Sequence, residues 1–253
     1  MDVTIAAPPI APDGSLKAVL FDLDGTLVDP AGGITGGIEH ALTVMGLPVP
    51  GADVLAAMIG PKLADALVSH VGIPVDQVPD VIAVYRRWYS STGMGMSALY
   101  PGIKGLLTQL RSAGVPLAVA TQKPEPLAKT LLAHHGIADL FDVICGSNPD
   151  ETLMPGDPGY RQGKAEIIAA ALGALCVPAG SAVMVGDRHQ DVNGARANGL
   201  DCIGVAWGFA PDGELAAAGV AAVVQSTDEL AALLAQGAGR GNTKAAEADH
   251  GAL

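Results

Sequence analysis

Two aspartates near the start of the chain have the spacing expected of a phosphoryl-transfer site. Asp22 and Asp24 follow an apolar run, residues 18–21, which reads as a buried parallel strand. Because successive side chains of an extended chain point to opposite faces, both carboxylates would lie on the same side. Two neighbouring carboxylates repel each other, and a divalent cation, or a proton held by one of them, would relieve that repulsion. Gly25 then permits the sharp exit from the strand.

Further polar side chains stand where later strands end or where helices begin. They are Thr121, Gln122, Lys164, Asp187 and Asp191. In a parallel α/β sheet, ligands bind beyond the carboxyl ends of the strands, so we expect these groups to meet Asp22 and Asp24 at one edge. Together the set offers a hydroxyl, an amine and four carboxylates.

The elements that must position these side chains alternate after residue 98. We expect apolar strands at 116–120, 142–145, 182–185, 202–205 and 220–224. Helical segments are expected between and around them, at 103–113, 124–135, 164–175, 191–198, 213–218 and 228–235. Such alternation with right-handed crossovers predicts an α/β fold, a doubly wound, Rossmann-like parallel sheet covered on both faces.

The stretch between the first strand and this alternating region shows only helical periodicity. Over residues 34–91 the apolar residues recur every three or four positions, which predicts four helices joined by short loops. We therefore expect a small all-helical cap, residues 31–97, inserted after the first strand. The core would then consist of residues 16–30 and 98–235.

The residues Asp22-Leu23-Asp24-Gly25-Thr26 resemble the signature of the haloacid dehalogenase superfamily, most of whose members are magnesium-dependent phosphatases. Other segments resemble its phosphoglycolate phosphatase-like branch, and within that branch the bacterial 5′-nucleotidase-like members. These segments include Tyr100-Pro101-Gly102-Ile103, Thr121-Gln122-Lys123-Pro124 and Gly204-Val205-Ala206-Trp207-Gly208. The resemblance spans residues 17–235.

This resemblance implies a role for each catalytic and phosphate-binding candidate. Asp22 matches the nucleophile that forms an aspartyl-phosphate. Asp24 matches the general acid and base, which protonates the leaving alcohol and then activates water. Thr121 matches the residue that hydrogen-bonds the phosphoryl oxygens, helped by the amide of Gln122 near a helix start. Lys164 matches the lysine that offsets negative charge on the nucleophile and the phosphate.

The resemblance also implies a magnesium site. Asp22, the backbone carbonyl of Asp24 and Asp187 would be ligands, and Asp191 would ligate or steady a bound water. Oxygen donors of this kind suit Mg²⁺. The segment 147–163 is longer than the family usually has before the lysine, so Lys164 could be displaced. Lys123 or Arg161 would then share its work.

The expected activity is hydrolysis of a small phosphate monoester, phosphoglycolate-like or a nucleoside 5′-monophosphate. A phosphosugar mutase of the β-phosphoglucomutase type shares every core motif and stays an alternative, as does a non-catalytic member of the fold. A dehalogenase is less favoured, because that chemistry uses no magnesium and does not need Asp24 as an acid. Lys62 and Arg86 in the cap are candidates for contacting the leaving group, although Lys62 reads equally well as a solvated lysine.

Composition restricts the partners. Lys and Arg total 14 and Asp and Glu total 26, so the formal net charge is −12, which argues against a nucleic acid polymer or an anionic membrane as partner. The three cysteines favour reduced thiols, and no apolar run approaches a membrane span. We expect a cytoplasmic monomer or homodimer acting on a small phosphorylated metabolite. Residues 1–15 and 236–253 read as a flexible arm and a disordered tail.

Overall fold

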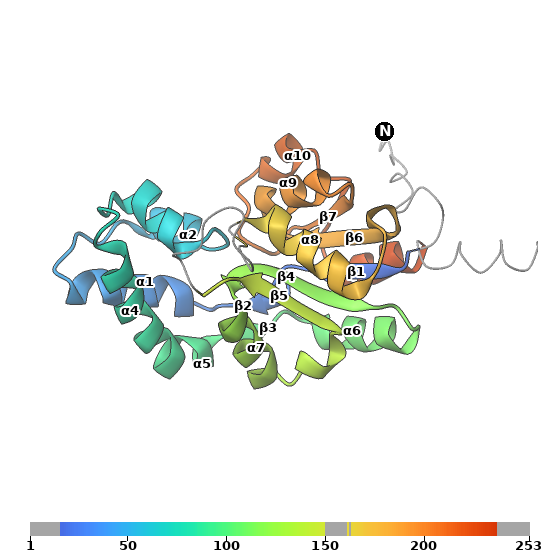
Figure 1. The fold of residues 1–253 in the computed structure, drawn as a ribbon, viewed down its shortest axis with the longest axis horizontal. Helices are drawn as coiled ribbons and strands as arrows, with labels where there is room; N and C mark the ends of the chain where they lie inside the picture. Colours follow the sequence, from blue (N-terminus) through green and yellow to red (C-terminus); the bar gives the residue numbers. More distant parts are fainter. Residues whose placement is uncertain (1–15, 150–160, 162, 237–253) are drawn as a thin grey trace, which may run out of the picture.

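A parallel β-sheet forms the centre of the molecule in the computed structural model, which describes residues 16–149, 161 and 163–236. Within these residues the sheet has six strands in the order β5-β4-β1-β6-β7-β8, all of them parallel (Figure 1). Their bounds are β1 Ala18–Phe21, β4 Leu117–Pro124, β5 Val143–Ser147, β6 Ala182–Gly186, β7 Asp201–Val205 and β8 Ala222–Val224. The predicted doubly wound α/β fold is confirmed.

Helices cover both faces of this sheet. One face packs against α6 (Ile103–Ser112), α7 (Glu125–His134) and a helix at 227–236, and the other packs against α8 (Lys164–Leu175), α9 (His189–Ala197) and α10 (Glu214–Ala218). Side chains of β1 alternate between the two apolar cores, with Val19 and Phe21 in one and Ala18 and Leu20 in the other. Burial on both faces explains why this strand reads as a continuous apolar run.

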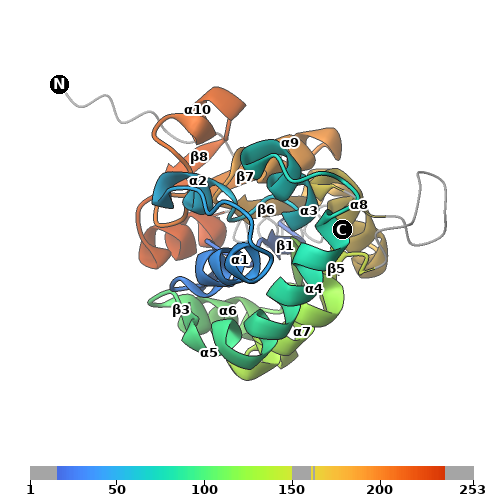
Figure 2. The same cartoon turned by 90° about the vertical axis from the view of Figure 1, so that its left-hand side faces the viewer.

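A helical module, residues 33–96, lies beside the sheet (Figures 1 and 2). It consists of α1 Gly33–Val44, α2 Ala52–Ala57, α3 Leu63–Ala66, a π-helical turn η1 Leu67–Val71, α4 Val78–Trp88, a second π-helical turn η2 Tyr89–Gly93 and α5 Met94–Met96. Because each π-helical turn continues the helix before it, the module has the four helical segments that the periodicity predicted, the last one longer than expected. Gly37 of α1 lies against Tyr85, and a Cβ there would come within 2.9 Å of the ring.

Two short strands join the helical module to the sheet. β2 (Val28–Asp29) pairs antiparallel with β3 (Ala98–Leu99), so the chain leaves and re-enters the core through adjacent segments. This pair could not be predicted from the sequence, because two residues are too few to show an alternating pattern. Short 3₁₀ turns, η3 (Ala138–Leu140) and η4 (Ala179–Ser181), precede β5 and β6.

Most element boundaries lie within three residues of the expected ones, and α8 begins and ends as predicted. β4 continues to Pro124, four residues beyond its predicted end, with an irregular register after Ala120. The helix at 227–236 includes Gln236, which was assigned to the tail. The predicted arm, the rest of the predicted tail and most of the 147–163 segment lie outside the described residues. In the described part of the chain, no helix combines the length and apolarity of a membrane span.

Candidate active site

A buried lysine holds the first aspartate of the motif. The Lys164 ammonium donates hydrogen bonds to Asp22 Oδ1 at 2.6 Å and to the carbonyl of Ala120 at 2.9 Å, and it forms an ion pair with Asp191 Oδ1 at 2.7 Å. Lys164 is the first residue of α8, so the helix start fixes its position. The long segment before it therefore has not displaced this lysine from the strand ends. Arg161 instead binds Glu125 Oε2 at 2.8 Å.

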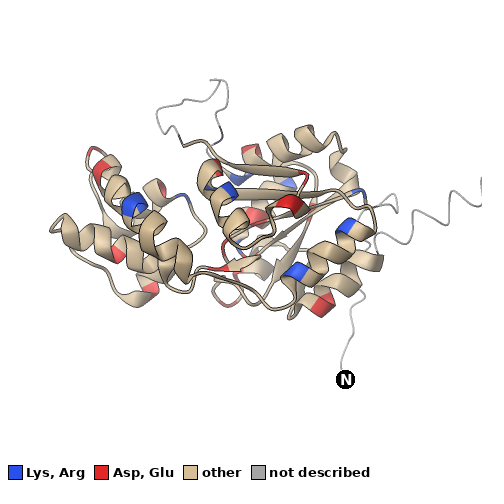
Figure 3. Cartoon of the chain, turned by 90° about the horizontal axis from the view of Figure 1, so that it is seen from below, with Lys and Arg blue, Asp and Glu red and all other residues tan. Residues whose placement is uncertain are grey.

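Three carboxylates converge beside this lysine. Asp22, Asp187 and Asp191 are all buried, and one oxygen of each lies within 4.8 Å of the others. The Thr26 hydroxyl donates to Asp187 Oδ1 at 3.2 Å, and the Phe209 amide donates to Asp187 Oδ2 at 2.8 Å. Gly25, at φ +88°, lies so close to Asp187 that a Cβ would collide with its carboxylate. Figure 3 shows acidic and basic segments together at the sheet edge that faces the helical module.

The charges in this cluster do not balance. Burial raises the pKa of Asp187 well above its usual value, and the neighbouring Asp22 and Asp191 carboxylates raise it further. Burial also raises the pKa of Asp191, against the opposing effect of Lys164. Burial alone would lower the pKa of Lys164, but Asp191 and Asp22 raise it, so this lysine is charged. One ammonium facing three buried carboxylates leaves room for a hard cation, and the all-oxygen donor set fits Mg²⁺.

The second aspartate of the motif has a lysine of its own. The Lys123 ammonium donates to Asp24 Oδ2 at 2.7 Å and lies over the ring of Tyr89, 4.8 Å from its centroid. The Lys123 side chain is only 6% exposed. Asp24 Oδ1 is buried and has no hydrogen-bond partner among the described residues. The Asp24 carboxylate is not part of the three-carboxylate cluster found in the described residues.

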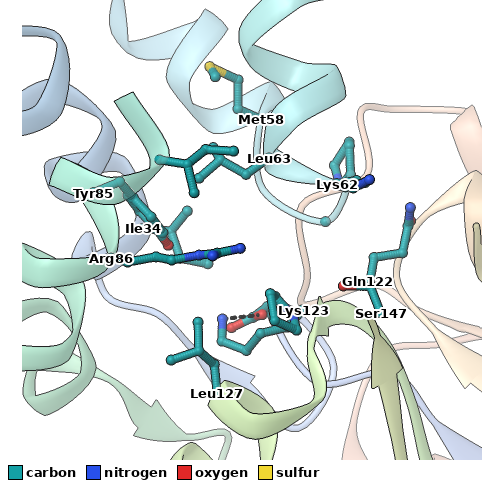
Figure 4. A pocket seen from close by; sticks show the side chains of 15 residues that line it. Ile34, Met58, Lys62, Leu63, Tyr85, Arg86, Gln122, Lys123, Leu127 and Ser147 are labelled. Atoms are coloured by element: carbon teal, nitrogen blue, oxygen red, sulfur yellow. Dashed lines mark hydrogen bonds and ion pairs between the residues drawn. The ribbon is translucent and has the colours of Figure 1, made fainter. Parts of the chain in front are cut away.

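A pocket lies between the helical module and the edge of the sheet that carries Asp24 and Lys123. Its cavity volume is about 70 Å³, and it opens to solvent. Asp24, Gln122 and Lys123 line it from the core, and Lys62 and Arg86 line it from the module, where Arg86 reaches in from α4 (Figure 4). The remaining wall is mostly apolar, formed by Ile34, Met58, Leu63, Ile82, Tyr85 and Leu127 among others. The two cap candidates therefore share one pocket with Asp24.

The two phosphate-binding candidates lie at the end of β4. Thr121 is buried, and its hydroxyl oxygen accepts a hydrogen bond from the Lys123 amide at 3.2 Å. Gln122 lines the pocket, and its side-chain oxygen is buried with no hydrogen-bond partner among the described residues. Gln122 lies three residues before α7, which begins at Glu125, one residue later than predicted, because β4 runs on to Pro124.

Arg188, which follows Asp187, connects the core to the helical module and was missed by the sequence analysis. Its Nη1 donates to the carbonyl of Ile59 at 2.6 Å, and its Nε donates to Glu214 Oε1 at 2.9 Å. Its backbone amide donates to Asp191 Oδ2 at 3.0 Å. The sequence signal was available in Gly186-Asp187-Arg188, but nothing in that triplet indicates a partner in a loop 129 residues away.

Comparison with known proteins agrees with this arrangement. Residues 19–205, most of the chain, match the family model described as "Haloacid dehalogenase-like hydrolase". The chain belongs to the haloacid dehalogenase-like hydrolase family. The family resemblance predicted from the aspartate motif is thereby confirmed.

Relatives within the haloacid dehalogenase-like family carry different names. Tyrosine-protein kinase PtkA of Mycobacterium tuberculosis is 42% identical over 199 residues, which cover 79% of this chain and 65% of that protein. A 5′-nucleotidase of Pseudomonas aeruginosa is 36% identical, covering 79% of this chain and 86% of that protein. A phosphoglycolate phosphatase of Cupriavidus necator is 35% identical, covering 86% and 92%. The chain thus spans somewhat less than two thirds of the mycobacterial kinase.

A solved structure has a similar fold over most of this chain. A predicted phosphatase from Clostridium acetobutylicum has a TM-score of 0.80 and 35% sequence identity, covering 88% of this chain and 99% of that one. The match over almost the whole length of that protein supports the fold described above.

Proposed function

We propose that this protein is a magnesium-dependent phosphatase that hydrolyses a small phosphate monoester through an aspartyl-phosphate on Asp22. The observation that carries the proposal is the pairing of each motif aspartate with a different buried lysine, Asp22 with Lys164 and Asp24 with Lys123. This arrangement gives the two aspartates separate surroundings, which suits one nucleophile and one proton carrier. The names of the 5′-nucleotidase and phosphoglycolate phosphatase relatives support the same reaction class.

In the first step, an oxygen of Asp22 attacks phosphorus. The bond from phosphorus to the leaving oxygen breaks, its electron pair stays on that oxygen, and the oxygen takes a proton from Asp24. Lys164 fixes the Asp22 carboxylate through Oδ1 and offsets charge near the phosphoryl group. The Thr121 hydroxyl and the Gln122 amide bind phosphoryl oxygens.

In the second step, the aspartyl-phosphate is hydrolysed. Asp24, now a carboxylate, removes a proton from a water molecule whose oxygen attacks phosphorus. The bond to Asp22 breaks, phosphate leaves and both aspartates return to their initial states. The helical module excludes other water from the pocket while this occurs.

Asp22, Asp187 and the backbone carbonyl of Asp24 would hold Mg²⁺. Asp191 belongs to the same carboxylate cluster and would bind either the cation or a water attached to it. When bound, the cation supplies positive charge opposite the phosphoryl oxygens.

The partners follow from the pocket. Its small volume and its position between the core and the helical module favour a small phosphorylated metabolite over a polymer, and Lys62 and Arg86 would contact the leaving group. We propose a monomer or homodimer in the cytoplasm, with no nucleic acid or membrane partner.

A second candidate is phosphoryl transfer to a tyrosine hydroxyl. The 42% identity to the mycobacterial tyrosine kinase favours it. Such a reaction would need a nucleoside triphosphate as donor and a protein tyrosine at the pocket in place of water. A phosphosugar mutase needs a sugar phosphate as acceptor and gives no net phosphate release.

The test is product analysis with the purified chain. Phosphoglycolate, nucleoside 5′-monophosphates, sugar phosphates and phenyl phosphate are incubated with Mg²⁺ or with a chelator, and free phosphate is measured. We expect Mg²⁺-dependent phosphate release from at least one ester. A rearranged sugar phosphate without phosphate release would identify a mutase, and labelled tyrosine in a peptide incubated with ATP would identify a kinase. No turnover of any ester would overturn the proposal.

A further inference from the structure

We propose that Lys123 is a positioning residue that aims the Asp24 carboxyl group at the leaving oxygen, and that it does so only while the helical module covers the site. The inference rests on the proposed phosphatase function and adds a residue to it. Three observations carry it. Lys123 binds only one of the two carboxylate oxygens of Asp24, the Tyr89 ring lies against the Lys123 ammonium, and Lys123 stands between the core and the helical module.

The first observation is that Lys123 occupies one oxygen of Asp24 and leaves the other free. Its ammonium holds Oδ2 at 2.7 Å, whereas Oδ1 is buried without a partner among the described residues. Asp24 lines the pocket and Lys123 holds its Oδ2, so we assign proton exchange with the leaving group to the remaining oxygen, Oδ1. A protonated carboxyl group can still accept a hydrogen bond at its other oxygen, so Lys123 can hold Oδ2 in both states of Asp24.

The second observation is that the helical module supplies the other contact of Lys123. Tyr89 begins η2, and its ring lies 4.8 Å from the ammonium, within the range of a cation–π contact. The ring is nearly fully buried and stacks on Tyr85, with centroids 5.6 Å apart and planes 18° from parallel. Tyr89 is therefore held rigidly by its own module.

The third observation is the position of Lys123 between the two parts of the molecule. Its backbone is in β4, its ammonium binds an aspartate that follows β1, and its aromatic contact comes from the module. If the module moves away, Lys123 loses the ring and gains access to water. A lysine side chain that is exposed to water samples many rotamers and its ammonium is hydrated, so it no longer holds Asp24 in one orientation.

This proposal differs from a binding role for Lys123. A lysine that binds the phosphoryl group or a leaving-group anion would lower KM for every ester that carries the same group. A lysine that positions the acid affects only those esters whose leaving oxygen needs a proton. Phenyl phosphate and p-nitrophenyl phosphate have nearly the same shape, but the nitro group makes the second leaving oxygen much less basic. Their comparison separates the two roles.

The experiment measures kcat/KM for both esters, which reports the step in which the leaving group departs. For Lys123→Met we expect phenyl phosphate cleavage to fall by about 10²-fold, the usual contribution of general acid catalysis, and p-nitrophenyl phosphate cleavage to fall by less than about 3-fold. Asp24→Asn removes the acid itself and so sets the largest loss expected. It too should lower phenyl phosphate cleavage more than p-nitrophenyl phosphate cleavage. Lys123→Arg should recover part of the loss. Lys129→Met, an exposed lysine on α7 whose side chain is 54% accessible, is the control and should change neither rate.

Two substitutions at Tyr89 test the dependence on the module. Tyr89→Leu removes the ring face and should lower phenyl phosphate cleavage by about 3- to 10-fold, the range expected from loss of a cation–π contact, with a smaller effect on p-nitrophenyl phosphate. Tyr89→Phe keeps the ring face and should lose less than Tyr89→Leu. Thermal melting of each variant identifies any that fail to fold, and the Tyr89 and arginine variants keep the test valid if Lys123→Met is one of them.

Distinct results would overturn each level of the proposal. Wild-type protein that cleaves neither ester, nor any other phosphate ester, removes the phosphatase function and this inference with it. An active wild type in which Lys123→Met lowers both rates equally removes the positioning role and leaves the phosphatase. Equal rates for Tyr89→Leu and wild type on phenyl phosphate remove the dependence on the helical module.

Discussion

Two buried lysines hold the two motif aspartates at nearly equal distances, 2.6 Å for Lys164 and Asp22 and 2.7 Å for Lys123 and Asp24. Their surroundings differ. The other partners of Lys164, Asp191 and the carbonyl of Ala120, belong to the core, whereas Lys123 also touches Tyr89 of the helical module. The nucleophile's half of the site is thus complete within the core, and the leaving group's half depends on the position of the module.

The substitution expected to have the largest effect tests the nucleophile's half. Asp22→Asn keeps the shape of the side chain and its hydrogen bond to Lys164 but removes the nucleophile, so kcat should fall by at least ~10⁴-fold with the fold intact. Phosphate release and the melting curve are the measurements. Asp53→Asn, at an exposed position of α2, is the matched control. Unchanged phosphate release by Asp22→Asn would remove this residue from the nucleophile's role.

A smaller loss is expected for the lysine of the same half. Lys164→Met should lower kcat/KM by about 10²- to 10³-fold, because the charge that offsets the phosphoryl group is lost. The loss should be equal for phenyl and p-nitrophenyl phosphate, in contrast to Lys123→Met. A markedly greater loss with phenyl phosphate would mean that Lys164, like Lys123, acts on the leaving group.

The third prediction concerns Lys62, one of the two cationic side chains with which the helical module lines the pocket. Lys62→Met should raise KM for phosphoglycolate about 10-fold, as expected from losing one hydrogen bond to a charged group, with little change in kcat. Phenyl phosphate, which has no second anionic group, should be unaffected. Lys104→Met, at an exposed position of α6, serves as the control. Equal KM changes for both substrates would mean that Lys62 does not contact the anionic part of the leaving group.

The smallest effect, a change in Tm, is expected for Glu214, which binds Arg188. Burial would raise the pKa of Glu214, but hydrogen bonds from Arg188 and His189 outweigh it, so the pKa lies below its ordinary value of 4.5. A carboxylate with a lowered pKa stabilises the fold above its unfolded pKa and loses that contribution as the pH falls through its folded value. Glu214→Gln should therefore lower Tm by roughly 2 °C at pH 7.

The same variant should approach the wild type in stability as the pH falls through the lowered pKa of folded Glu214, because the side chain is then protonated in both folded and unfolded protein. Melting curves at several pH values provide the measurement, and Glu39→Gln on the exposed side of α1 is the control. A difference in Tm that widens toward acid pH would contradict the assigned direction of the shift.

The core of the site was predictable because its residues obey a topological rule. Asp22 and Asp187 each follow an apolar strand, Thr121 follows the apolar part of β4, and parallel strands deliver such residues to one edge. Lys164 was predictable as a helix start, although the length of the preceding segment argued against it. The position of Asp191 within the carboxylate cluster follows from its place one helical turn after Asp187, but its direct partnership with Lys164 required coordinates.

The contacts between the core and the module could not be predicted. Lys123, Tyr89 and Arg188 lie in segments with no shared periodicity, and their contacts depend on the docking angle of the helical module. The β2–β3 pair, which joins the module to the sheet, is too short to leave a pattern in the sequence. Local rules therefore describe what each segment forms, whereas the half of the site that spans both parts depends on how the parts meet.

The hydrogen bond from Arg188 to the carbonyl of Ile59 has a consequence for release of products. A hydrogen bond to a charged group contributes about 1.5–3 kcal/mol net, which corresponds to roughly a 10- to 160-fold bias in an equilibrium. Taken alone, this hydrogen bond favours the state in which the helical module covers the site. The state without the bond would still be populated at a level of about one to ten per cent. Phosphate and alcohol can then escape through ordinary fluctuations of the loop that carries Lys62, with no chemical event needed to open the way.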